Sequence, residues 1–176
     1  GSYKYALVIG SEKMSEIVNW KDRSVCVLFG DGAGAVVLKA VDNNTEDVTG
    51  ASAGQERGII DSNIYNDGTG ASVLTGGRRF SDSCSTDIFI HMDGQEVFKF
   101  AVKSVPTAIE TLLHNNNMNV DDVDKFILHQ ANVRIIESVA KRLKADKDKF
   151  PVNLNEYGNT SSASIPILLD ELNRNG

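Results

Sequence analysis

Cysteine, proline and long hydrophobic runs are all scarce in this 176-residue sequence. Its two cysteines, Cys26 and Cys84, are too few for a disulfide scaffold or a cysteine-based zinc site, and such scarcity is typical of a reducing compartment. No apolar stretch approaches the roughly 20 residues that a membrane-spanning helix needs. No signal peptide is visible at the N-terminus either. We therefore expect a soluble, cytoplasmic protein that does not enter a membrane.

Positive charge is also in the minority, because 18 lysines and arginines face 24 aspartates and glutamates, for a net charge of −6. A chain with this balance is not a nucleic-acid binder as a whole, and any basic surface must be local. The remaining composition is ordinary for a globular protein, with 41% hydrophobic residues, 24% charged residues and 15 glycines. The length predicts one domain, residues 1–176, with a substantial hydrophobic core.

Short runs of β-branched and aromatic residues alternate along the chain with longer segments whose apolar residues recur every three or four positions. The short runs predict strands at residues 5–9, 25–29, 35–38, 48–60, 88–90, 125–128 and 150–154. The longer segments predict helices at residues 97–113, 135–143 and 165–172. This alternation indicates an α/β fold with helices layered on a sheet.

Two features modify this pattern. Pro106 lies inside the first predicted helix and predicts a kink or local rearrangement there, whereas Pro166 is tolerated in the first turn of the last helix. Residues 61–86 are rich in glycine, asparagine and aspartate and have no regular period. Since long irregular segments within compact domains are usually functional or mobile, we interpret this one as a substrate-side loop or flap.

Gly30–Ala35 fits the loose dinucleotide-binding pattern G-x-G-x-x-[GA]. That motif requires a helix N-terminus that points at the pyrophosphate of the ligand. Here Val36–Leu38 continue as a predicted strand, so the dipole of a helix is missing. We interpret the segment as a glycine turn between two core strands, and the Asp31-Gly32 pair is typical of a tight turn or hairpin.

Gly50–Gly54 matches the nucleophile-elbow pattern G-x-S-x-G, with Ser52 at its centre. The pattern works where a strand turns sharply into a helix, but no apolar helical face follows Gly54. The chain order Ser52, an aspartate and then His129 would nevertheless suit an α/β-hydrolase. This function remains an alternative.

The cysteines and histidines show no other catalytic or metal-binding pattern. Cys26 is predicted to be a small buried residue of a strand, and Cys84 lies in a polar loop without a basic neighbour that would lower its pKa. His91, His114 and His129 lie on different predicted elements and lack metal-ligand spacing. We predict no metal site.

His129 follows a predicted buried strand and precedes a helix, the place where α/β folds commonly bind ligands. A second polar segment, which begins with Gly158 and Asn159, lies between a predicted strand and the last helix. Gly158 would allow the backbone to approach a ligand, and Asn159 can present a side-chain N–H. Two neutral donors directed at one point, an imidazole and a carboxamide, form an oxyanion hole or an enolate clamp.

Three motifs together resemble one family. They are His129-Gln-Ala-Asn132-x-Arg134-Ile, Gly158-Asn159-Thr-Ser-x-Ala-Ser164 and Gly30-Asp-Gly-Ala-Gly-Ala35. They resemble β-ketoacyl-acyl-carrier-protein synthase III, a condensing enzyme of the thiolase-like superfamily, and the resemblance is colinear over all 176 residues. It implies the C-terminal half of a thiolase-like α/β fold, truncated at both ends, with helices layered on a mixed five-stranded-type sheet.

In that family a cysteine accepts an acyl group from coenzyme A, and a histidine and an asparagine promote decarboxylation of malonyl-acyl-carrier protein. The motifs assign these last two roles to His129 and Asn159. Both would donate hydrogen bonds to the malonyl thioester oxygen as it gains enolate charge, and one such donor is worth about 3 kcal/mol. His129 would be neutral, with its proton on the nitrogen that faces the substrate. The resemblance implies no cofactor beyond the coenzyme A thioester and the phosphopantetheine-bound substrate.

The resemblance also implies substrate-binding positions. Met92 and Phe98 would line the acyl or pantetheine tunnel, although Phe98 is equally consistent with simple core packing. Asn132 would lie near the pantetheine arm, Gly158 beside the substrate, and Arg23 next to the adenine of coenzyme A.

A local basic face would dock the carrier protein, which is acidic, by complementary charge. The residues that match this role in the family are Lys99, Arg134, Lys141 and Arg142.

The nucleophile does not carry over, because the family has it at a strand–helix junction upstream of the strand that begins here at Tyr3. Neither Cys26 nor Cys84 occupies such a junction. We therefore expect the C-terminal half of a bacterial enzyme, homodimeric at full length, that starts type II fatty acid synthesis from an acyl-CoA, most simply acetyl-CoA. This half alone would be inactive in acylation. A non-catalytic interaction module that keeps the fold is a further alternative.

Overall fold

The structure is a computed structural model that describes residues 3–40, 58–76 and 88–175. The strands are β1 (Tyr5–Glu12), β2 (Gly32–Lys39), β3 (Leu74–Gly76) and β4 (Ile90–Met92). The α-helices are α1 (Gly94–Asn115), α2 (Val133–Leu143), α3 (Leu154–Tyr157) and α4 (Ser164–Asn175). Short 3-10 helices are η1 (Met14–Glu16), η2 (Gly68–Gly70), η3 (Val120–Asp122), η4 (Lys147–Lys149) and η5 (Ser161–Ala163). The predicted strands at 5–9 and 35–38 and the three predicted helices are confirmed, and the strand predicted at 88–90 is present as β4, shifted to Ile90–Met92.

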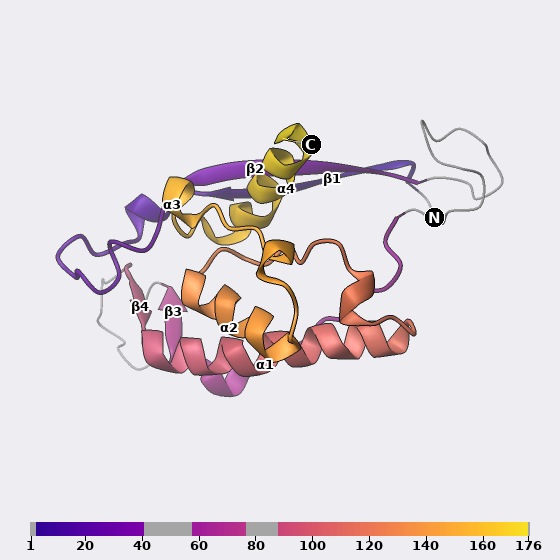
Figure 1. Cartoon of the computed structure of the whole chain (residues 1–176). Helices are drawn as coiled ribbons and strands as arrows, with labels where there is room; N and C mark the ends of the chain where they lie inside the picture. Colours follow the sequence, from indigo (N-terminus) through magenta and orange to yellow (C-terminus); the bar gives the residue numbers. More distant parts are fainter. Residues whose placement is uncertain (1–2, 41–57, 77–87, 176) are drawn as a thin grey trace.

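β1 and β2 form a long antiparallel ribbon, paired from Tyr5 with Lys39 to Glu12 with Gly32, and α4 packs against it (Figure 1). Glycines in the ribbon make this packing possible. A Cβ at Gly34 would lie 3.0 Å from the Cβ of Pro166, in the first turn of α4. The Gly30–Ala35 motif therefore leads into a strand that α4 approaches closely. Its interpretation as a glycine turn between two core strands is wrong, because turns precede Gly30 and Gly32–Ala35 are part of β2, paired with β1.

The main hydrophobic core lies between α1 and α2, on the other side of α4 from the ribbon (Figure 1). Its buried members come from α2 and the segments that flank it: Phe126, Ile135, Ile136, Val139, Ala140, Leu143 and Phe150. The rings of Phe126 and Phe150 stack with centroids 4.7 Å apart. The buried residues of α2 recur every three or four positions, which is the pattern that predicted this helix.

Helix α1 continues through Pro106 without a break. A proline has no N–H, so the carbonyl of Val102, four residues earlier, loses its donor in the helix. Arg142 on α2 supplies one instead, because its Nη1 donates to the Val102 carbonyl oxygen at 3.3 Å. The rearrangement expected at Pro106 is thus a replaced hydrogen bond that ties α1 to α2.

The strand predicted at 25–29 is wrong. Residues 23–28 form consecutive turns, in which the N–H of Cys26 donates to the Asp22 carbonyl at 2.9 Å. The Asp22 carboxylate also accepts from the backbone and hydroxyl of Ser24, and such local bonds compete with a strand ladder. Cys26 is therefore a half-buried turn residue, and only Val25 is fully buried.

The strands predicted at 125–128 and 150–154 are also wrong, because neither segment forms a strand and α3 begins at Leu154. The side chain of Gln130, which is 0% exposed, connects them instead. It donates to the Leu128 carbonyl at 3.0 Å and accepts from the N–H of Asn153 at 3.2 Å. The described strands consequently form two separate two-stranded antiparallel sheets, β1–β2 and β3–β4, and not the expected five-stranded type.

Part of the predicted loop at 61–86 has regular structure. The carboxylate of Asp67 caps η2 by accepting from the N–H of Thr69 at 3.0 Å, and β3 follows and pairs with β4. The remainder of that loop beyond residue 76, and most of the strand predicted at 48–60, lie outside the described residues. None of the helices in the described part of the chain is long and apolar enough to cross a membrane.

Candidate active site

Residues 159–164, between α3 and α4, form the structural centre of the candidate site. The segment is tied to the chain before β2 through the backbone of Asn159, whose N–H donates to the Leu28 carbonyl at 2.9 Å and whose carbonyl accepts from the N–H of Gly30 at 3.0 Å. Gly158 has φ +67° and ψ −163°, a conformation that only glycine adopts readily. A Cβ at Gly158 would lie 3.2 Å from the Leu28 carbonyl oxygen, so the chain passes close to its own backbone at this glycine.

The side chain of Asn159 is held in one orientation. Its Oδ1 accepts from the N–H of Ser161 at 2.9 Å, and Ser161 itself has φ +48°. Since a backbone N–H can only donate, the atom that faces it is the carboxamide oxygen, and the NH₂ group points the other way. Asn159 is 9% exposed, so its carboxamide is a fixed, largely buried donor.

His129 follows the irregular segment after Phe126 and contacts the start of α4. Its Nδ1 lies 2.6 Å from the Oγ of Ser164, a part-buried contact, although the residue as a whole retains exposed surface. Burial lowers the pKa of His129 from its ordinary value of 6.5, and a hydrogen bond to the backbone of Ser161 opposes this more weakly. The imidazole is therefore neutral near pH 7.

His129 and Asn159 are thus anchored to the same short segment, one through Ser164 and the other through Ser161. Together they supply two neutral donors, an imidazole and a carboxamide, of the kind that stabilises negative charge on a reacting oxygen. Thr160, between Asn159 and Ser161 in the sequence, is 1% exposed, and its Oγ1 has no hydrogen-bond partner among the described residues.

The segment has a further anchor that the sequence did not suggest. Glu12, at the end of β1, accepts from the Oγ of Ser162 at 2.6 Å and from its N–H at 3.3 Å. These bonds hold the pKa of Glu12 below its ordinary value. A residue 150 positions away along the chain gives no local signal in one sequence, so only the fold could identify this contact.

Comparisons of sequence and of fold with known proteins give one consistent family. The family model of 3-oxoacyl-[acyl-carrier-protein] synthase III matches residues 1–68, and the model of its C-terminal part matches residues 113–176. The chain is 43% identical to the β-ketoacyl-[acyl-carrier-protein] synthase III of Clostridium acetobutylicum, over 100% of this chain and 52% of that protein. The synthase III structure from Aquifex aeolicus is 42% identical and superposes with a TM-score of 0.83, over 98% of this chain and 50% of that one.

This chain belongs to the 3-oxoacyl-[acyl-carrier-protein] synthase III family. It spans about half the length of the curated relatives it matches. A second synthase III structure, from Pseudomonas aeruginosa, is 32% identical with a TM-score of 0.83 and covers 98% of the chain. The predicted thiolase-like α/β fold is thereby confirmed.

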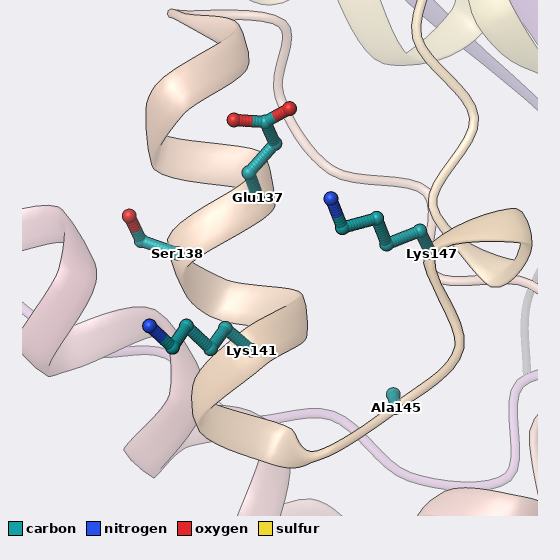
Figure 2. A pocket seen from close by; sticks show the side chains of 5 residues that line it. All are labelled: Glu137, Ser138, Lys141, Ala145 and Lys147. Atoms are coloured by element: carbon teal, nitrogen blue, oxygen red, sulfur yellow. The ribbon is translucent and has the colours of Figure 1, made fainter.

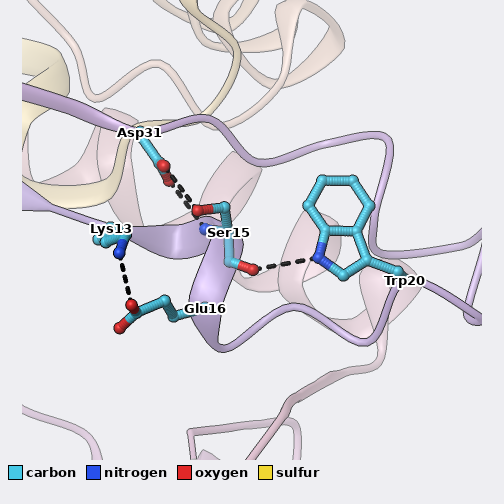
Figure 3. Close-up of polar contacts among 5 residues, drawn as sticks. All are labelled: Lys13, Ser15, Glu16, Trp20 and Asp31. Carbon is cyan, nitrogen blue, oxygen red and sulfur yellow. Dashed lines mark hydrogen bonds and ion pairs between the residues drawn. The ribbon is translucent and has the colours of Figure 1, made fainter.

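Arg23 is the residue predicted to lie next to the adenine of coenzyme A. It lies in an exposed turn after Trp20, whose indole Nε1 donates to the Ser15 carbonyl at 3.1 Å (Figure 3). Asp31 fixes Ser15 in turn, accepting from its N–H at 2.8 Å and from its Oγ at 2.6 Å, and these bonds lower the pKa of Asp31. Lys13 and Glu16 form an exposed ion pair in the same view.

Three other predicted substrate positions lie on three different elements. Met92 ends β4 and is half-buried, close to the start of α1. Phe98 on α1 packs against the main core, which supports a packing role. Asn132 is the N-cap of α2, and its Oδ1 accepts from the N–H of Arg134 at 2.9 Å.

The predicted docking residues of the synthase III chain are exposed on α1 and α2, but their surroundings differ. Lys99 pairs with Glu96 at 2.6 Å, and Arg142 donates to the Val102 carbonyl. Lys141 lies on the exposed face of α2 and lines a shallow hollow with Glu137, Ser138, Ala145 and Lys147 (Figure 2). Two ammonium groups, those of Lys141 and Lys147, therefore border this hollow.

Ser52, the candidate hydrolase nucleophile, and Cys84 lie outside the described residues. Within the described part of the chain, no group of three or more histidine, cysteine, aspartate or glutamate residues is arranged to hold a metal ion.

Proposed function

We propose that the protein to which this chain belongs catalyses the decarboxylative condensation of an acyl-CoA, most simply acetyl-CoA, with malonyl-acyl-carrier protein, the first condensation of type II fatty acid synthesis. The observation that carries this proposal is the joint anchoring of His129 and Asn159 on residues 159–164. Family membership supports it, since the relatives are named as β-ketoacyl-[acyl-carrier-protein] synthase III.

In the proposed reaction, the bond between the malonyl α-carbon and its carboxylate breaks and CO₂ leaves. The electron pair passes into the thioester, which becomes an enolate with its charge on oxygen. His129 and Asn159 each donate a hydrogen bond to that oxygen. In enzymes, removing one donor of this kind typically slows the reaction by about 10²–10³-fold. The α-carbon then attacks the acyl group on a cysteine, which leaves as the thiolate. We assign that cysteine to residues beyond these 176.

Substrate and carrier binding extend the proposal to residues around this centre. Arg23, in its fixed turn, would contact the adenine of coenzyme A. Met92 and Asn132 would lie along the acyl and pantetheine arms, and Gly158 would shape the backbone beside them. The docking face would consist of the exposed cations on α1 and α2: Lys99, Arg134, Lys141 and Arg142.

The proposed assembly is a homodimer in the cytoplasm. The dimer is supported by the β1–β2 ribbon, where Leu7, Ile9 and Val37 are each more than 60% exposed. Apolar surface of this kind on neighbouring strands usually marks a contact with another part of the protein or with a partner subunit.

The test uses the product of the complete reading frame that contains this chain. It is incubated with acetyl-CoA and malonyl-acyl-carrier protein, and the 3-oxoacyl product is measured by mass spectrometry. We expect product from the unaltered protein and at least a hundredfold less from Asn159→Ala. An esterase activity that Ser52→Ala abolishes and Asn159→Ala leaves intact would contradict the proposal and favour a hydrolase.

A further inference from the structure

Ser164 lies where α4 begins, and its hydroxyl has two neighbours. The Oγ is 2.6 Å from the Nδ1 of His129 and 3.3 Å from the backbone nitrogen of Gln130. Ser164 is 2% exposed and Gln130 is 0% exposed, so water does not compete freely at this point. The three groups form a short chain that ends on the imidazole.

The direction of each hydrogen bond follows from counting donors. The N–H of Gln130 can only donate, so it occupies one lone pair of the Ser164 oxygen. The hydroxyl has one proton, and among the described residues the acceptor that forms a hydrogen bond with it is the Nδ1 of His129. If Nδ1 carried a proton instead, the buried hydroxyl proton of Ser164 would have no acceptor, and an unmade buried hydrogen bond is costly.

We propose that Ser164 is a positioning residue that donates its hydroxyl proton to Nδ1 of His129 and so fixes the neutral imidazole in the Nε2–H tautomer. The nitrogen that carries the proton is set by the hydrogen bond that the other nitrogen makes. Only the catalytic consequence of this tautomer rests on the proposed function, because there the Nε2–H group is the donor to the malonyl thioester oxygen. The tautomer itself is a property of the resting protein.

The backbone of Ser161 is the competing partner. Its hydrogen bond to the ring favours the charged form, while burial, the larger influence, favours the neutral one. If the proton lay on Nδ1, the Ser164 oxygen would accept from both Nδ1–H and the N–H of Gln130, and its own hydroxyl proton would be left without an acceptor among the described residues. The proposal therefore makes a statement that spectroscopy can decide without any substrate.

The experiment uses the product of the complete reading frame, labelled with ¹⁵N-histidine, and records long-range ¹H–¹⁵N spectra above pH 7. The His129 signals are identified by their absence in His129→Gln. We expect an unprotonated Nδ1 and a protonated Nε2 in the unaltered protein and in Ser164→Thr, which keeps the hydroxyl. In Ser164→Ala we expect this tautomer to lose its dominance. Ser162→Ala is the matched control, because the Ser162 hydroxyl bonds Glu12 and not the imidazole.

Kinetics supply a second measurement. Ser164→Ala should lower kcat for malonyl decarboxylation by about tenfold or more, as expected for the loss of a group that orients a functional histidine, and should leave acylation by acetyl-CoA unchanged. A protonated Nδ1 in the unaltered protein would overturn the inference even if no Ser164 variant folds. If the tautomer is as stated but the protein forms no 3-oxoacyl product, the proposed function fails and the role of Ser164 stands.

Discussion

Replacing Gly30 with alanine tests how the chain just before β2 positions the active-site segment. The N–H of Gly30 holds the Asn159 carbonyl, and alanine keeps this donor. The backbone at Gly30 is outside the left-handed region, so alanine is also allowed conformationally. The new Cβ, however, would lie 2.1 Å from the carbonyl oxygen of Tyr157, whereas ordinary contacts begin at 3.4 Å.

Tyr157 directly precedes Gly158 and Asn159, so relief of this overlap moves the active-site segment by roughly 1 Å, a displacement that can cost about a hundredfold in rate. Overpacking of this kind also destabilises a protein by about 1–3 kcal/mol. We therefore expect Gly30→Ala to unfold at lower urea concentration and to lose about two orders of magnitude in condensation rate. Gly68→Ala is the control, because a Cβ there meets nothing within 4 Å. If the two variants are equally stable and equally active, the close packing of Tyr157 against Gly30 does not position the site.

Three further predictions follow from single contacts. Arg142→Ala should reduce the free energy of unfolding by about 1 kcal/mol. The loss should be clearly smaller in a Pro106→Ala background, because an alanine at position 106 has an N–H that can donate to the Val102 carbonyl. Equal losses in the two backgrounds, measured by urea unfolding in a double-mutant cycle, would contradict the role of Arg142. Burial lowers the pKa of His129 below 6.5, so as the pH falls the histidine takes up its proton in the unfolded state before it does so in the folded state. The free energy of unfolding should therefore fall as the pH drops through 6.5, and the decarboxylation rate should decline only at lower pH. A decarboxylation rate that already declines above pH 6.5 would refute this. Lys141→Glu should raise KM for the malonyl-carrier substrate with little change in kcat, while Lys39→Glu on β2 should not; identical KM values in steady-state assays would remove Lys141 from the docking face.

The sequence alone predicted the helices well because their apolar residues follow the helical period, and the buried face of α2 is the stripe that the pattern indicates. Short apolar runs were less informative. Residues 25–29 have strand-like composition, but Asp22 captures the following N–H groups and produces turns. The run before His129 does not form the predicted strand, and the buried Gln130 side chain makes the hydrogen bonds that connect this run to Asn153.

At the candidate site, too, the sequence predicted some features well and others not at all. The residue types of His129 and Asn159 and the glycine beside Asn159 identified the chemistry, and the structure attaches both side chains to one segment. The contacts that hold this segment come from distant parts of the chain, including Glu12 and Gly30, and no local pattern marks them. Ser164 lay within the motif, but its contact with His129 spans 35 positions and depends on where α4 begins.

The central claim is that His129 and Asn159 act on the malonyl substrate and not on acyl transfer from coenzyme A. The most direct measurement separates the two half-reactions in the complete gene product. One assay follows incorporation of radiolabelled acetyl groups into the protein, and the other follows release of labelled CO₂ from malonyl-acyl-carrier protein. We expect His129→Ala and Asn159→Ala to be acetylated as the unaltered protein is, and to release CO₂ at least a hundredfold more slowly. CO₂ release at the unaltered rate in either variant would contradict the account.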